Sequence, residues 1–177
     1  MTPLAALALA LAAAAPDAGQ LAREAFPEAE RVEPRELLLT DELAARLEAL
    51  SHARVKERRV AFVAALKGPG AGLVVGWLVV HEHVVRTKRE TLSIAFEPDG
   101  RIRKVRVIEF QEPPEYRTPE RWLAQLEGKG PDDKVTVGQD LAPISGATLS
   151  ARGVAEASRW LLQALKLAAH PPAGGRP

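Results

Sequence analysis

The chain has 177 residues, of which 46% are hydrophobic and 27% are charged, a composition typical of globular proteins rather than disordered ones. It contains no cysteine, which excludes disulfide scaffolds, thiolate zinc and iron–sulfur sites, thioether-linked haem, lipoprotein acylation and cysteine nucleophiles. Twenty-four basic residues against 23 acidic ones give a net charge of +1, which argues against a dedicated nucleic-acid-binding protein.

The chain begins with an apolar run. Residues Leu4–Ala15 are all Leu or Ala, and the run is shorter than the roughly 20 residues that a membrane-spanning helix needs. Its length suits the apolar core of a secretory signal, and Ala12-Ala13-Ala14, near its end, provide small residues for cleavage. The alternative is a Leu- and Ala-rich helix of a soluble protein, which the lack of a polar face disfavours. We therefore predict a signal peptide over residues 1–18, and export.

An N-terminal helical segment is expected over residues 19–58. The first helix should run from about Asp17 to Phe26 and stop before Pro27. Thr40 is a good N-cap for a second helix that ends near Leu50, because acidic residues follow it in the first turn.

Four strand-like runs follow, separated by short turns. They are residues 60–66, 73–85, 91–96 and 102–110, and a Pro-Asp-Gly turn separates the last two. This pattern predicts an antiparallel meander. Residues 51–106 also hold twelve basic and only five acidic residues. Such an excess is typical of a solvated sheet face, although it can also attract an acidic partner or a phosphate group.

The last part of the chain is predicted to be helical. A short helix should begin at Pro119, and a long one should run from about Thr148 to Ala168 with Leu161 and Leu165 on its buried face. The Pro- and Gly-rich residues 169–177 are predicted to be a disordered tail. The expected fold class is therefore α+β, a single domain with an antiparallel sheet of about four strands packed by helices and a long C-terminal helix.

The residues with a chemical role lie in one short segment, Ser145-Gly146-Ala147-Thr148-Leu149-Ser150. A glycine-containing turn lets a ligand approach the backbone closely, and the start of a helix presents free N–H groups and the positive end of its dipole. Three hydroxyl groups share this turn, so the sequence predicts a phosphate site. An ordinary Ser or Thr N-cap is the alternative.

This segment resembles the S/T-G-A-T motif of the FMN-binding domain family, found in flavin subunits of sodium-pumping NADH:quinone reductases and Rnf-type electron-transport complexes. Further similarities are the glycine-containing strand at Gly72–Gly76, the hairpin at Glu97–Ile102 and the turn at Glu112-Pro113. Together they cover about residues 70–165, and they place the FMN-binding domain at residues 59–168.

The resemblance implies that FMN is joined to Thr148 through a phosphoester that a flavin transferase makes. It further implies an exported flavoprotein that acts in electron transfer rather than a stand-alone enzyme. Such a protein would lie in the periplasm or on the extracytoplasmic face of the inner membrane, with peripheral membrane association and envelope electron-transport proteins as partners. The residues expected around FMN are Ser145, Gly146, Ala147, Ser150, Tyr116 and Lys129, with Lys134, Arg152 and Trp122 as further candidates.

Two features leave alternatives open. The family usually has Asp three residues before the motif, where this chain has Ala142, with Asp140 as the nearest acid. A chain that kept the fold and lost the flavin would instead be a binding or assembly module of an envelope redox complex. His81 and His83 share one strand face, but no further ligand is evident, so we expect packing rather than metal binding there.

Overall fold

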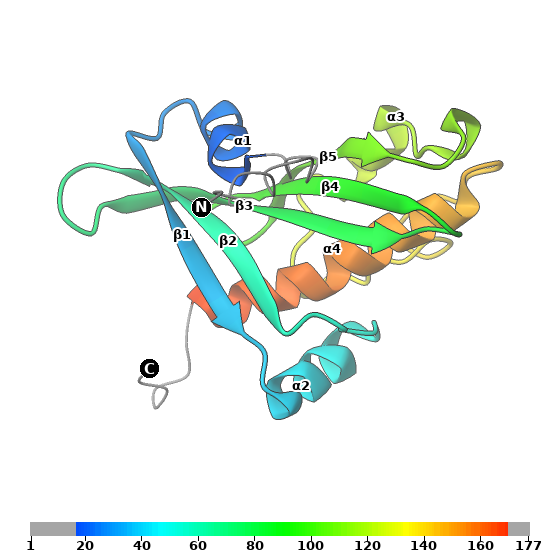
Figure 1. Cartoon of the computed structure of the whole chain (residues 1–177), viewed down its shortest axis with the longest axis horizontal. Helices are drawn as coiled ribbons and strands as arrows, with labels where there is room; N and C mark the ends of the chain where they lie inside the picture. Colours follow the sequence, from blue (N-terminus) through cyan, green and yellow to red (C-terminus); the bar gives the residue numbers. More distant parts are fainter. Residues whose placement is uncertain (1–16, 170–177) are drawn as a thin grey trace, which may run out of the picture.

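The computed structural model describes residues 17–169, so the apolar run Leu4–Ala15 and most of the predicted tail lie outside the described residues. A five-stranded antiparallel sheet, whose strands lie side by side in chain order, forms the centre of the fold (Figure 1). Its strands are β1 (Arg31–Leu38), β2 (Arg59–Lys67), β3 (Leu73–Val84), β4 (Arg89–Phe96) and β5 (Ile102–Phe110).

Both faces of the sheet are covered. In β2, Phe62, Ala64 and Leu66 contribute to the main core, whereas the alternate residues Val63 and Ala65 contribute to a smaller core on the other face. This follows from the two-residue period of side chains along a strand. The smaller core is closed by α1 (Ala18–Ala25), and the main core is closed by α4 (Thr148–Ala169) (Figure 1).

The long helix α4 organises the main core. Its residues Trp160, Leu161 and Leu165 are buried there, and α2 (Asp41–Ser51) packs beside it. The short helix α3 (Glu120–Leu123) continues as a 3₁₀ turn over Ala124–Leu126, and another 3₁₀ turn covers Pro114–Tyr116. The first turn of α4 lies at the same end of the molecule as the turn between β3 and β4 (Figure 1).

The predicted fold class is confirmed, with five strands in place of about four. The additional strand is β1, which lies in the segment where only helices were expected. It is charged and contains Pro34, features that disfavour a central strand. β1 is an edge strand that pairs only with β2, and a proline is tolerated at an edge because one row of N–H groups has no strand partner there.

No helix within residues 17–169 combines the length and the apolar character that crossing a membrane requires.

Candidate functional site

The start of α4 is open to a ligand. Gly146, just before the helix, has φ of +86°, and a Cβ added there would meet nothing within 4 Å. The first backbone bond of the helix runs from Ala151 N–H to the carbonyl of Ala147. In the described part of the chain, no group accepts a hydrogen bond from the three preceding N–H groups, those of residues 148–150. These donors and the positive helix end suit a phosphate group.

The two hydroxyls of this first turn have different surroundings. Thr148 is half-buried, and its Oγ1 donates a hydrogen bond of 2.7 Å to the carbonyl of Ile144. Ser150 is 1% exposed, and its Oγ donates a bond of 2.6 Å to the carbonyl of Tyr116. Ser150 therefore connects α4 to the 3₁₀ turn over Pro114–Tyr116. Thr148 is the more accessible of the two possible nucleophiles.

Thr148 lines a small pocket of about 90 Å³ that also contains an arginine. The pocket is formed by residues 146–150 together with Tyr116 and Arg86. The guanidinium carbon of Arg86 lies 4.7 Å from the centre of the Tyr116 ring, a cation–π contact. Within residues 17–169, Arg86 forms no ion pair, so its N–H donors are free to bind an anion at this turn.

Glu112 fixes the turn that carries Arg86. Its Oε1 accepts hydrogen bonds from the backbone N–H groups of Thr87 (2.8 Å) and Lys88 (2.9 Å). The hydrogen bond from Thr87 is the largest of the effects that hold the pKa of the Glu112 carboxyl below its usual value. Glu112 is only 8% exposed, and it therefore acts as a structural anchor for the β3–β4 turn.

The sequence of residues 88–163 matches the model of the FMN-binding domain family. This part of the chain is an FMN-binding domain. The match confirms the family resemblance and the predicted cofactor, FMN, and it includes the whole of the segment from Ser145 to Ser150. Strands β1 to β3 precede the matched residues and belong to the same sheet.

The fold is similar to that in the crystal structure of NqrC from Shewanella oneidensis. The two sequences are 18% identical, the similarity covers 78% of this chain and 80% of that chain, and the TM-score is 0.50. At this identity the likeness supports the fold alone. No curated protein matches the sequence.

The residues around Thr148 fit the phosphate of FMN. Unpaired N–H groups, the open space beside Gly146 and the unpaired Arg86 supply hydrogen bonds and positive charge. Sequence reasoning missed Arg86 because it lies about sixty residues before the motif. The only signal was its place in the basic segment 51–106, for which phosphate attraction was one interpretation.

Of the predicted site residues, the structure brings Gly146, Ala147, Thr148, Ser150 and Tyr116 together in one pocket. Ser145 directly precedes it, and among the described residues its side chain forms no hydrogen bond, so it is not a helix cap here. Arg152, one turn into α4, is exposed, and so is Lys134.

Lys129 does not line this pocket. Its Nζ lies 3.0 Å from Oδ2 of Asp140. That oxygen also accepts a hydrogen bond from Val135 N–H, and Oδ1 of Asp140 accepts one from Thr136 N–H. Burial would raise the pKa of the Asp140 carboxyl, but these bonds and Lys129 outweigh it and hold that pKa below its usual value. Asp140 is therefore engaged in its own loop and does not take the place of the acid missing at Ala142.

Trp122, the other aromatic candidate, is 4% exposed. Its Nε1 donates a hydrogen bond of 2.7 Å to the carbonyl of Ala142. Trp122 is thus a core residue that supports the loop before the motif.

Proposed function

We propose that this protein is an exported flavoprotein that carries FMN through a phosphoester on Thr148 and transfers electrons in the cell envelope. The observation that carries this proposal is the accessible Thr148 hydroxyl beside three unpaired N–H groups and an unpaired arginine. The family match supports an electron-transfer flavoprotein, because flavin carries electrons by its own chemistry and the protein supplies anchoring and orientation.

In this proposal, the first turn of α4 and Arg86 bind the phosphate group together. The free N–H groups of residues 148–150 and the guanidinium of Arg86 would hold the phosphate oxygens. Attachment joins the Thr148 oxygen to the phosphorus of the flavin donor, breaks the bond from that phosphorus to its leaving group, and releases the hydroxyl proton with that group. The hydrogen bond from Thr148 to Ile144 would therefore be lost. Its loss costs about 1 kcal/mol, less than the 1.5–3 kcal/mol typical of one hydrogen bond to a charged group.

Export is the second part of the proposal, and it depends on the apolar run Leu4–Ala15. The family resemblance adds a flavin transferase that acts outside the cytoplasm and partners among envelope electron-transport proteins. Peripheral association with the membrane would bring the flavin to those partners. An assembly module without flavin is the competing function, and Ala142, at the position where the family usually has Asp, is the observation that favours it.

Replacing Thr148 tests the attachment. Thr148→Val keeps the shape of the side chain and removes the nucleophilic oxygen. When the full chain is co-expressed with a flavin transferase, wild type should retain flavin fluorescence in a denaturing gel and show one added flavin phosphate by intact mass. Thr148→Val should show neither.

Ser150→Ala is the matched control, because it removes a hydroxyl two residues away that is already bonded to Tyr116. It should retain the covalent flavin. Loss of the flavin in Ser150→Ala but not in Thr148→Val would place the ester on Ser150. If wild type carried no covalent flavin, the competing function, an assembly module without flavin, would be favoured.

A further inference from the structure

The turn between β3 and β4 is held by a carboxylate that lies outside it. Glu112 follows β5, and its Oε1 accepts hydrogen bonds from Thr87 N–H at 2.8 Å, from Thr87 Oγ1 at 3.2 Å and from Lys88 N–H at 2.9 Å. After that of Thr87, the backbone N–H groups of Lys88 and Arg86 also lower the pKa of this carboxyl. Successive N–H groups of a turn form a concave binding site for an anion. Here the anion is the chain's own Glu112.

Few other contacts fix this turn. Among the residues that the structure describes, the backbone hydrogen bond that closes it runs from Val85 N–H to the carbonyl of Lys88, at 3.1 Å. Arg86, Thr87 and Lys88 are exposed, so burial in the core does not hold them. Glu112, by contrast, is buried, and the turn is attached to its carboxylate. The backbone position of Arg86 therefore depends on Glu112.

The side chain of Arg86 is held by the same short segment. Tyr116, four residues after Glu112, places the centre of its ring 4.7 Å from the guanidinium carbon. Pro113 and Pro114 restrict the backbone before Tyr116, whose N–H donates a hydrogen bond of 3.0 Å to the carbonyl of Pro113. The segment thus fixes both the backbone turn and the guanidinium of Arg86.

This segment is also attached to the first turn of α4. The carbonyl of Tyr116 accepts the 2.6 Å hydrogen bond from Ser150 Oγ. Ser150 is buried, so water does not compete for this bond. The β3–β4 turn and the first turn of α4 lie at the same end of the molecule (Figure 1). One short segment therefore connects Arg86 to the free N–H groups at the start of α4.

Fixing Arg86 in advance favours the binding of an anion. An arginine side chain loses rotamer freedom when it binds, and a contact that already restricts it reduces that loss. The ring of Tyr116 carries no net charge, so it restricts the guanidinium without neutralising it. Glu112 bonds to the backbone of the turn, and in the described structure it forms no ion pair with Arg86. The positive charge stays available.

We propose that Glu112 is a positioning residue for the phosphate group of FMN and that it acts through Arg86. Glu112 does not touch the phosphate. It holds the β3–β4 turn so that the guanidinium lines the pocket at the first turn of α4, and Tyr116 supports the side chain. The inference rests on the proposed attachment at Thr148, which places the phosphate in this pocket. A purely structural carboxylate would stabilise the fold without changing the affinity for phosphate.

Inorganic phosphate tests the site without the flavin ring and without a transferase. In the unmodified, isotope-labelled full chain, phosphate should shift the NMR signals of the N–H groups of residues 148–150 and of the Arg86 side chain along one saturable curve. Glu112→Leu keeps the bulk of the side chain and removes the acceptor oxygen, so the dissociation constant should rise about tenfold. Glu112→Gln keeps an acceptor oxygen and should stay within about threefold of wild type.

A double variant shows whether Glu112 acts through Arg86. Arg86→Gln alone should also raise the dissociation constant for phosphate about tenfold. If Glu112 only positions Arg86, adding Glu112→Leu to Arg86→Gln should raise it by less than about twofold more, because the effects of coupled residues do not add. Two losses that multiply to about a hundredfold would overturn the inference, as would wild-type affinity in Glu112→Leu.

Asp140 provides the matched control for a general loss of structure. Its carboxylate also accepts hydrogen bonds from N–H groups of its own loop, those of Val135 and Thr136, but it does not line the Thr148 pocket. Urea unfolding should show that Asp140→Leu and Glu112→Leu both lose stability, whereas only Glu112→Leu should lose affinity for phosphate. An equal loss of affinity in the two variants would contradict the inference.

Tyr116→Leu tests the other contact of the segment and leaves Glu112 in place. Tyr116 is half-buried, so this variant should fold, and without the ring the dissociation constant for phosphate should rise about threefold. Tyr116→Phe keeps the ring and should retain the wild-type affinity. Equal affinity of Tyr116→Leu and wild type would contradict the support of Arg86 by this ring.

Phosphate binding and flavin attachment are measured separately. A wild type that binds phosphate at the start of α4 but carries no covalent flavin in a denaturing gel would contradict the proposed function and leave the positioning by Glu112 supported. A wild type whose signals show no saturable shift with phosphate would overturn the positioning role itself.

Discussion

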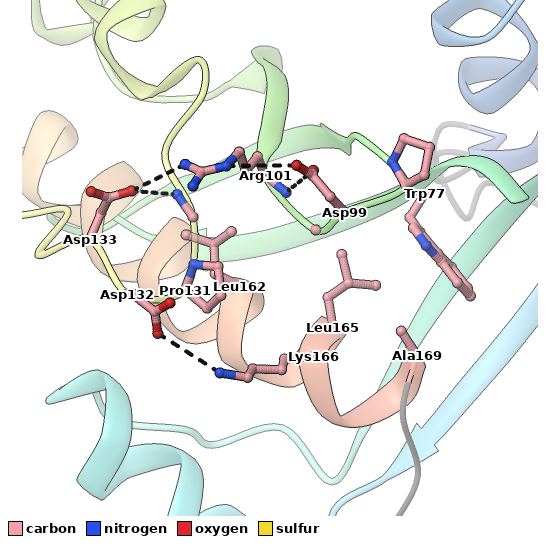
Figure 2. Close-up of a pocket in the computed structure, with 13 residues that line it drawn as sticks. Trp77, Asp99, Arg101, Pro131, Asp132, Asp133, Leu162, Leu165, Lys166 and Ala169 are labelled. Carbon is pink, nitrogen blue, oxygen red and sulfur yellow. Dashed lines mark hydrogen bonds and ion pairs between the residues drawn. The ribbon is translucent and has the colours of Figure 1, made fainter.

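The two ends of α4 differ in how fully their polar groups are paired. At the C-terminal end, a cavity of about 620 Å³ is lined by apolar side chains such as Trp77, Leu162 and Leu165 (Figure 2). Its charged groups are paired with each other: Arg101 lies 3.7 Å from Asp99 and 3.9 Å from Asp133, and Lys166 lies 3.8 Å from Asp132 (Figure 2).

The N-terminal end has smaller spaces, but its polar groups are unpaired. The N–H groups of residues 148–150 and the guanidinium of Arg86 have no hydrogen-bonding partner among the described residues. Because an anion can accept hydrogen bonds from these free donors, whereas the charges at the other end are already paired, unpaired groups locate a binding site better than volume does.

The largest expected effect concerns His81, which is buried beside the N-terminal half of α4. Burial and then the positive charge of His83 lower the pKa of His81 from 6.5 to about 4. Between these values the unfolded chain binds the proton more tightly, so stability falls as the pH falls below 6.5. From pH 6.5 to pH 5 this loss is about 2 kcal/mol, at roughly 1.4 kcal/mol per pH unit.

Urea unfolding at several pH values measures this loss. His81→Gln should lose about 2 kcal/mol less than wild type over that range. The exposed His52 provides the control, because His52→Asn tolerates the left-handed conformation (φ +50°) and should keep the wild-type pH dependence. The same pH dependence in His81→Gln and wild type would mean that His81 does not titrate as its burial indicates.

The second effect compares the arginines at the two ends. Arg86→Gln removes a charged hydrogen-bond donor from the Thr148 pocket, and the initial rate of flavin attachment should fall about tenfold, equivalent to about 1.4 kcal/mol. Arg101→Gln removes an arginine from the far cavity and should leave the rate unchanged. If the rate of flavin attachment fell equally in the two variants, the two ends of α4 would not differ in how their arginines bind the phosphate.

The smallest effect compares two glycines. Gly146 has φ of +86°, so Gly146→Ala should lower the free energy of unfolding by about 1 kcal/mol through backbone strain, although its Cβ meets no protein atom. Gly130→Ala, beside the far cavity, meets only ordinary contacts and should change stability by less than about 0.5 kcal/mol. Chemical denaturation of both variants measures the difference, and a fully stable Gly146→Ala would show that this turn relaxes.

The sequence was informative wherever a feature depends on neighbouring residues. Apolar runs bounded by turns predicted β2 and β3, and alternating apolar residues predicted β4 and β5. Thr40 and the residues after it predicted α2 with the correct N-cap. The motif at Ser145–Ser150 predicted the start of the last helix and the family, which the match over residues 88–163 confirms. In each case the period of the side chains or the chemistry of the helix end lies within a few residues of sequence.

Tertiary structure decided the features that depend on residues far apart in the chain. Pairing with β2 makes a strand of the charged, proline-containing β1, because an edge position tolerates both properties. The antiparallel pairing of β3 with β4, and the packing of α4 on the sheet, bring the β3–β4 turn, and with it Arg86, to the first turn of α4. The same packing encloses His83 and Glu90 together with Trp160, and Lys129 is instead paired with Asp140 in another loop. A local pattern predicts which elements form, but the charges and unpaired groups that meet at a site depend on how those elements pack.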